Sequence, residues 1–492
     1  MKRYSERSRR RRVAGACISL CVLSAGLDAS ATDLLDAARR NDGPAATRLL
    51  RAGANPGARA PSGESALQWA AHHDNAALVR ALLAAGARPG ANHYGETDLQ
   101  SACVHGGAET IGLLLAAGAD PQAAGPGGVP LLLLAAKSGR ADAVRLLLER
   151  GASVASTESD QGQTALMWAA AEGNADAMQV LLRAGAEVDA KSRGGFNALH
   201  FAARQGQLVA AKLLLAHSAK VDAPAGEEGD GPTALGLAVT NAHFELAAML
   251  LTSGANPNHR WRGHAALHVL TWVMRPGVGT NDPPPKGSGR LDRLDLLREL
   301  VRHGADVNLR MESRRANGLR TQLNLKGGTP FLLAARTADV EMMRLLVELG
   351  ADPRAANEDG TTPLLAAAGV GVHSPEEDPG TIPEVVEAVR LAVELGNDVN
   401  AVDRRGETAL HGAAYKYAAP IVPYLLGNGA RIEVWNRKNA NGWTPLRIAT
   451  GVHRTMNLRS SPETAEALRQ IMQAAGVSTD LEPETNISGA TN

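Results

Sequence analysis

The stretch NALHFAARQGQLVAAKLLL, residues 197–215, shows how this chain is organised. Gly206 interrupts an apolar pattern that one long amphipathic helix would carry straight through. The pattern has helical spacing on both sides of this glycine, at Leu199, Ala202 and Ala203 and again at Val209, Leu213 and Leu214. Because such spacing gathers apolar side chains on one helix face, the stretch predicts two short helices joined by a tight turn.

The same pattern returns along the chain with a period of about 33 residues, which insertions lengthen in places. A period of this size is typical of repeat architectures. Aligning the first residue of each copy gives Thr32, Ser65, Thr97, Val129, Thr164, Asn197, Thr233, Ala265, Thr329, Thr362, Thr408 and Thr444. The spacing therefore predicts about twelve repeats between residues 32 and 478.

Two copies carry a recognisable motif: GGFNALHFAARQGQLVAAKLLLAHSAKVDA at 194–223 and RRGETALHGAAYKYAAPIVPYLLGNGARIEV at 404–434. They resemble the ankyrin repeat family, whose unit is a β-finger, a TPLH-type helix, a glycine turn and a second helix. The resemblance covers residues 32–478. It implies an all-α repeat solenoid, a curved stack with a concave binding face, and a function in protein–protein interaction without catalysis.

A physical reason supports the repeat interpretation independently of the family. A single helix pair cannot bury its apolar face, so its stability comes from neighbouring copies. Alanine pairs such as Ala70-Ala71 and Ala202-Ala203 allow helices to approach closely, while Leu67 and Leu199 fill the space between layers. The last predicted helix, within 462–476, is more polar on its outer side, as a terminal copy requires. Residues 479–492 lack apolar periodicity and are predicted to form a disordered tail.

The N-terminus predicts a signal peptide at 1–31. A basic start, MKRYSERSRRRR, leads into an apolar run of about 15 residues, and Ala29-Ser30-Ala31 matches a cleavage site. A membrane-spanning helix needs roughly 18 to 20 residues, so an uncleaved anchor is the weaker alternative. We therefore expect cleavage near Ala31, a periplasmic or secreted protein, and no stable membrane insertion afterwards. Cys103 would be the only cysteine left, and we expect it to be buried as a small apolar side chain.

Composition and motifs argue against several kinds of chemistry. The 51 basic and 51 acidic residues cancel, so we expect no nucleic-acid partner. The HAALH sequence at 264–268 has an alanine where the metalloprotease motif needs its general-base glutamate. His268 instead occupies the same position in its repeat as His200 and His411. The resemblance assigns a histidine at this position to local hydrogen bonding at the start of a helix. We expect no cofactor, no metal, no catalytic residues and a monomer that binds an unidentified protein.

Four insertions interrupt the C-terminal repeats, at 275–290, 311–327, 369–383 and 451–462. Three of them separate paired helices in repeats eight, ten and twelve and would emerge from the same edge of the stack. They are either tolerated surface loops or a composite edge that contacts a partner. A less favoured hypothesis places a metal or enzymatic site on two of these loops, with His373, Asp282, Glu376, Glu377 and Asp378 as its polar residues. Another alternative is a secreted effector that binds a host protein.

The resemblance also nominates a binding surface. In ankyrin proteins, residues beside the finger-tip glycine and before the inter-helix turn face the partner. Carried over position by position, this set is His93, Tyr94, Glu96, Gln163, Arg193, Phe196, Arg204, Trp261, Arg262, His264, Arg404, Arg405, Tyr415 and Trp443. Its arginines and aromatic residues match the composition of interface hot spots. Trp69, Trp168 and Phe201 share a slot within the first helix, where packing is favoured over a ligand cage.

Overall fold

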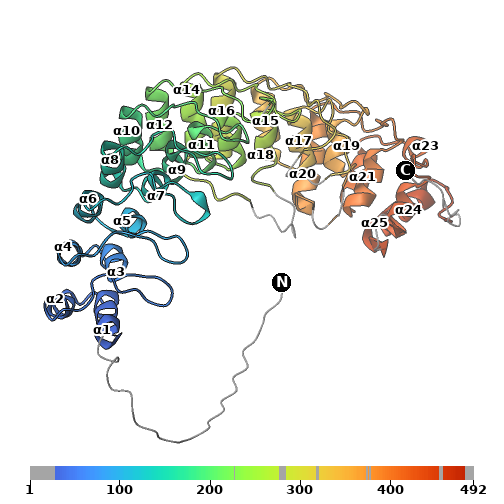
Figure 1. Cartoon of the computed structure of the whole chain (residues 1–492). Helices are drawn as coiled ribbons and strands as arrows, with labels where there is room; N and C mark the ends of the chain where they lie inside the picture. Colours follow the sequence, from blue (N-terminus) through green and yellow to red (C-terminus); the bar gives the residue numbers. More distant parts are fainter. Residues whose placement is uncertain are drawn as a thin grey trace, which may run out of the picture. The chain divides into compact units, whose positions relative to one another are not determined.

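The computed structural model describes residues 28–226, 228–275, 284–316, 321–372, 375, 378–453 and 458–481, and of 28–32 and 452–459 only the backbone. Within these residues the chain forms twelve consecutive helix pairs (Figure 1). The one hairpin described in them joins β1 (Val452–His453) to β2 (Leu458–Arg459) in antiparallel register. The predicted all-α stack of about twelve repeats is therefore confirmed.

The helix pairs follow the predicted period. In repeats one to six they are α1 Asp28–Arg39 with α2 Gly43–Arg51, α3 Ala66–His72 with α4 Ala76–Ala84, α5 Asp98–His105 with α6 Ala108–Ala116, α7 Leu131–Lys137 with α8 Ala141–Glu149, α9 Ala165–Glu172 with α10 Ala175–Arg183, and α11 Ala198–Arg204 with α12 Leu208–Ala216. In repeats seven to twelve they are α13 Ala234–Thr240 with α14 Phe244–Thr252, α15 Ala266–Leu270 with α16 Arg293–Arg302, α17 Pro330–Arg336 with α18 Val340–Glu348, α19 Pro363–Ala368 with α20 Ile382–Glu394, α21 Ala409–Lys416 with α22 Ile421–Gly427, and α24 Pro445–Thr450 with α25 Pro462–Ala474. The 3-10 turn η1 (Pro126–Gly128) and α23 (Ile432–Trp435) lie in links between pairs.

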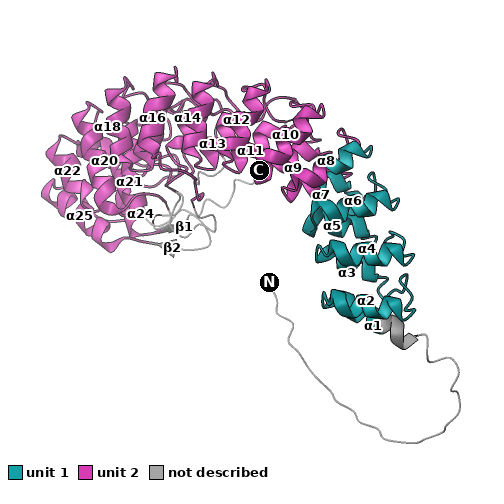
Figure 2. Ribbon diagram, turned by 90° about the vertical axis from the view of Figure 1, so that its left-hand side faces the viewer, with its two compact units in different colours: residues 1–134, 145–152 teal, residues 135–144, 153–492 magenta. Residues whose placement is uncertain are grey.

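The chain divides into two compact units (Figure 2). Unit 1 comprises residues 1–134 and 145–152, and unit 2 comprises 135–144 and 153–492. The division therefore runs through α7 and α8.

Capping and packing explain why these segments form short helices. Ser65 begins α3 and accepts a hydrogen bond from the Gln68 backbone N–H at 3.0 Å, which satisfies one otherwise unpaired helical donor. Gly206 has φ +71°, a left-handed conformation that glycine adopts without strain. It ends the first helix of its pair as expected. The alanines of each pair and the interlayer leucines are fully buried, so within each unit neighbouring repeats share a core.

The boundary of the array differs from prediction at its N-terminal end. Helix α1 begins at Asp28 rather than at Thr32, so the predicted cleavage near Ala31 would remove its first turn. The rest of the predicted signal peptide, residues 1–27, lies outside the described residues, as does the predicted tail from 482 onward. None of the described helices is long and apolar enough to cross a membrane.

Two of the predicted insertions contain regular structure in their described residues. Helix α20 begins at Ile382, inside the predicted 369–383 loop, because Thr381 and Glu384 form a capping box. The loop at 451–462 contains the β1–β2 hairpin, which the sequence did not indicate. The second and third insertions also bond to each other, since the Gln322 backbone N–H donates to the Gly371 carbonyl at 2.8 Å.

Candidate binding surface

Backbone hydrogen bonds tie successive fingers together. The backbone N–H of Arg193 donates to the carbonyl of Gln161 at 2.8 Å, and that of Arg404 donates to Asp359 at 2.8 Å. Equivalent bonds join 93 to 62, 226 to 194, 312 to 263, 358 to 326 and 440 to 405. Because each of these fingers is held by its neighbour, the side chains on them are presented from a pre-organised backbone.

A large pocket, here called the aromatic pocket, opens beside the fingers of repeats six to eight in unit 2. Its volume is about 630 Å³. It is lined by Phe196, Ala225, Gly226, Asp230, Gly231, Pro232, Leu237, Thr240, Trp261, Arg262, His264, Val269, Trp272, Val273, Pro284 and Pro285. Four predicted contact residues therefore converge here, namely Phe196, Trp261, Arg262 and His264, together with Trp272, which the sequence analysis did not single out.

Close packing fixes the wall of the aromatic pocket. The ring centroid of His264 lies 4.8 Å from that of Trp261 and 5.8 Å from that of Trp272. Gly236 in α13 makes room for the Trp261 indole, because a Cβ at Gly236 would lie 3.0 Å from two ring carbons. Burial lowers the pKa of His264 to about 4, so its imidazole is neutral near pH 7. Its Nδ1 has no hydrogen-bond partner among the described residues.

Three predicted contact residues are buried, which corrects their assignment to an exposed surface. Trp261 is 7% exposed and His264 is 4% exposed, because both pack into the wall of the aromatic pocket rather than standing at the finger tip. Tyr415 is 3% exposed. Its hydroxyl donates to Glu407 Oε1 at 3.1 Å and accepts from Asn439 Nδ2 at 2.8 Å, so this tyrosine braces α21 against the following finger.

The other predicted residues remain accessible but do not form one cluster. Gln163, Phe196 and Trp443 are half-buried, while His93, Tyr94, Glu96, Arg193, Arg204, Arg262, Arg404 and Arg405 are exposed. Some of their polar atoms already have partners. Arg193 Nη1 donates to the Asp160 carbonyl at 2.6 Å, and Gln163 Oε1 accepts from Trp168 Nε1 at 2.7 Å. They remain predictions for a surface spread along several fingers.

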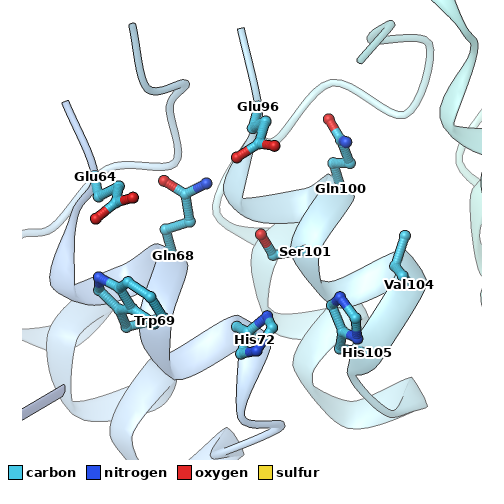
Figure 3. Close-up of a pocket in the computed structure, with 9 residues that line it drawn as sticks. All are labelled: Glu64, Gln68, Trp69, His72, Glu96, Gln100, Ser101, Val104 and His105. Carbon is cyan, nitrogen blue, oxygen red and sulfur yellow. The ribbon is translucent and has the colours of Figure 1, made fainter. Parts of the chain in front are cut away.

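A second pocket, here called the acidic pocket, lies between repeats two and three in unit 1 (Figure 3). It has a volume of about 270 Å³ and is lined by Glu64, Gln68, Trp69, His72, Glu96, Gln100, Ser101, Val104 and His105. The sequence analysis nominated only Glu96 of this set and favoured packing for Trp69. The missed signal is a repetition, because glutamate and glutamine recur four residues apart in both repeats.

The TPLH-type histidines have the structural role that the resemblance implies. The Nδ1 atoms of His200, His268 and His411 accept from the cap backbone N–H at 3.1, 3.2 and 3.2 Å. Each Nε2 reaches a carbonyl of the following finger, as from His200 to Ala223 at 2.9 Å. Burial lowers the pKa of all three to about 4. Cys103 is buried as expected, and burial raises the pKa of its thiol to about 12.

A third pocket, of about 620 Å³, lies among the inter-helix insertions of unit 2. Its wall contains a buried ion pair between Arg336 and Asp378 at 3.2 Å. Lys416 Nζ donates to the carbonyls of Asp378 and Pro379 at 2.9 and 3.0 Å. Burial, followed by the charge of Arg336, lowers the pKa of Lys416 to about 8. These contacts tie the third insertion to the neighbouring first helices.

The hypothesis of a metal or enzymatic site on the loops gains no support. His373, Asp282, Glu376 and Glu377 lie outside the described residues, and Asp378 is engaged with Arg336. Within the part of the chain that the structure describes, no group of three or more His, Cys, Asp or Glu side chains could hold a metal ion.

Comparisons with known proteins agree with this architecture. Models of ankyrin repeats match residues 34–125, 124–192 and 188–261 in three copies, and further ankyrin models match 326–358 and 393–449. Together these ranges cover more than half of the chain. No curated protein matches it.

Among solved structures, one similar chain is described as "Crystal structure of the ankyrin repeat domain of Bcl-3: a unique member of the IkappaB protein family". It is 27% identical over 41% of this chain and 92% of its own length, with a TM-score of 0.36. The helix pairs, the finger hydrogen bonds, the histidine bridges and the matched models lead to one conclusion: the chain belongs to the ankyrin repeat family.

Proposed function

We propose that this chain is a non-enzymatic binding protein that holds a protein partner against its fingers and the adjoining first helices, here called the finger side. The aromatic pocket carries the proposal. Its Phe196, Trp261 and Trp272 rings surround a space sized for apolar side chains of a partner, and Arg262 lies exposed at its rim. Buried aromatic anchors rimmed by arginine are typical of interface hot spots.

The finger backbone supports the same proposal. Hydrogen bonds between neighbouring fingers already hold the presenting backbone, so a partner would order few residues when it binds. Ankyrin repeats typically mediate protein–protein interaction, and the chain's membership of this family agrees with a binding role.

The test is affinity capture with matched variants. Phe196→Ala with Arg262→Asn removes accessible parts of the pocket, and asparagine tolerates the left-handed backbone at 262, where φ is +50°. Val209→Ala is the control, because Val209 is an exposed apolar residue on α12 outside the pocket. We expect the pocket variant to lose captured partner while the control retains it. Equal capture by both variants would refute the proposed surface.

We also propose that the protein works outside the cytoplasm, in the periplasm or after secretion. The support is the basic start, short apolar run and Ala29-Ser30-Ala31 sequence of the N-terminus. Fractionation of the source cells, with mass spectrometry of the mature N-terminus, tests it. Recovery in the periplasm or the medium with an N-terminus near Thr32 is the expected result, whereas an intact Met1 in the cytoplasm would contradict it. Recovery inside a host cell would identify the effector alternative.

A further inference from the structure

We propose that the acidic pocket of repeats two and three binds an arginine side chain of the partner. This inference rests on the proposed function, since it states the chemistry of one contact with that partner. It concerns unit 1 alone and is independent of the aromatic pocket.

Two carboxylates give the pocket its charge. Glu64 and Glu96 occupy the same slot in consecutive repeats, each directly before a helix cap. Neither forms an ion pair with a cation among the described residues. Glu96 Oε2 accepts one hydrogen bond, from Asn92 Nδ2 at 2.9 Å. Arg59, a cation on the same finger as Glu64, is held instead by the carbonyls of Gly63 and Ala91 at 2.7 and 2.8 Å. The pocket is therefore complementary to a positive charge.

The Gln68 carboxamide makes the pocket more than an acidic patch. Gln68 is only 7% exposed, and its side chain makes no hydrogen bond within the described residues. In the view of Figure 3 its amide lies between Glu64 and Glu96. Gln100 occupies the same slot one repeat later, and its Oε1 is buried without a hydrogen-bond partner. Gln100 Oε1 lies against the following finger, where a Cβ at Gly125 would come within 2.6 Å of it, so the Gln68 amide, which lines the pocket without a partner in the protein, is the one placed to accept a ligand's donors.

The remaining wall suits the apolar stem and flat head of an arginine. Trp69 presents a half-buried indole whose one face already holds the Arg39 guanidinium, 5.3 Å from the ring centroid, and the rings of His72 and His105 lie with centroids 4.4 Å apart. Burial lowers the pKa of His72, with smaller effects of His105 and His73. Its imidazole is therefore neutral near pH 7 and does not repel a cation.

The acceptor set favours arginine over lysine. A guanidinium offers five N–H donors in a planar fork, whereas an ammonium is a compact point charge with three donors. The two carboxylates, one from each repeat, and the Gln68 amide oxygen between them match the fork. The volume of about 270 Å³ suits one side chain rather than a folded surface.

The test uses the full chain labelled with fluorotryptophan and observed by fluorine NMR. The Trp69 resonance is assigned from a Trp69→Phe variant among the six tryptophans. The probe is N-acetyl-arginine amide, compared with the lysine and the uncharged citrulline analogues. We expect a saturable shift of the Trp69 resonance by the arginine probe, at a Kd on the order of millimolar because one side chain carries little binding energy. The lysine analogue should bind more weakly and citrulline should not bind.

Matched variants separate the pocket from the general charge. Glu64→Gln with Glu96→Gln should weaken the arginine probe at least about tenfold, since charged hydrogen bonds are lost. Glu109→Gln with Glu149→Gln removes the same charge from exposed positions of unit 1 and should leave the Kd unchanged. Equal losses in both variants, equal binding of citrulline, or a Trp69 shift with Zn²⁺ but none with arginine would overturn the inference. If the aromatic-pocket variant abolishes capture while no probe shifts Trp69, this inference fails and the proposed function stands.

Discussion

The acidic pocket and the aromatic pocket are built from the same repeat slots and have opposite chemistry. The residue before the helix cap is Glu64 or Glu96 in the first and Phe196 or His264 in the second. Seven residues after the cap stand His72 and Val104 in the acidic pocket, and Thr240 and Trp272 in the aromatic pocket. The repeat backbone thus fixes where side chains are presented, and the residue type at a few repeat positions decides the chemistry of each pocket.

The two pockets also differ in how far their walls belong to the core. Trp261 and Trp272 are almost fully buried, whereas Trp69 is half-buried and His72 is exposed. The aromatic pocket is therefore part of the packing of unit 2, and the acidic pocket is a surface feature of unit 1. This difference can be tested through stability as well as binding.

Of the tryptophans in the two pockets, Trp261 should contribute more to stability than Trp69. Trp261→Ala should destabilise unit 2 by about 3–5 kcal/mol, because it leaves a cavity against α13. Trp69→Ala should cost less, about 2 kcal/mol, since part of that ring is already exposed. Urea unfolding, with hydrogen exchange used to follow each unit separately, measures the loss of stability in both variants. Equal losses for the two variants would show that the pockets do not differ in burial.

Acid should weaken the aromatic pocket through His264. Its folded pKa of about 4 lies below the usual 6.5, so the unfolded chain binds the proton first as the pH falls. Stability should therefore decline from about pH 6.5 to pH 4, by up to about 3 kcal/mol from this residue, and the decline should stop below pH 4.

A His264→Gln variant isolates that contribution. We expect its urea midpoint to fall less between pH 6.5 and pH 4 than that of the wild type. Background acid sensitivity from His200, His268 and His411 remains in both proteins and cancels in the comparison. An identical pH profile for the variant would contradict a neutral, buried His264.

Replacing Gln68 should raise the stability of the protein, and only slightly. Gln68→Leu should stabilise unit 1 by up to about 1 kcal/mol, because it replaces an amide that makes no hydrogen bond within the protein by an apolar side chain of similar size. The same variant should lose arginine binding. Thermal unfolding and the fluorine NMR titration check the two expectations. A destabilised variant would mean that the Gln68 amide has a structural partner.

The repeat period was sufficient to predict the fold because the same local contacts shape every repeat. The glycine at 206, the capping residues and the histidine bridges all act locally, over one repeat or its nearest neighbour. The start of α1 at Asp28 was not predictable in this way, since the first repeat has no preceding copy against which to align it. The hairpin at 451–462 lies in an insertion, where no period applies.

The binding residues were harder to predict because the position of a residue in the repeat does not determine how deeply its side chain is buried. Trp261 lies on a finger, yet its indole packs inward, because Gly236 has no side chain and leaves room for the ring. Tyr415 stands before an inter-helix turn, yet Glu407 and Asn439 hold its hydroxyl. These contacts depend on side chains in other repeats, which a position-by-position transfer does not consider.

The acidic pocket was missed for a related reason. Its glutamines occupy the slot where His200 and His268 bridge to the next finger. A structural role at that repeat position holds for these histidines but not for Gln68 and Gln100, which make no such bridge. A repeat whose usual bridging histidine is replaced by an unpartnered amide is therefore a sequence signal for a binding position.

We propose that partners bind the finger side, through pockets whose chemistry depends on the residue type at a few repeat positions. Hydrogen exchange of the full chain with and without its captured partner tests this most directly. We predict new protection in the fingers and first helices that line the acidic and aromatic pockets, with exchange unchanged around Val209 on α12. Protection confined to the second helices or to the inter-helix insertions would contradict the account.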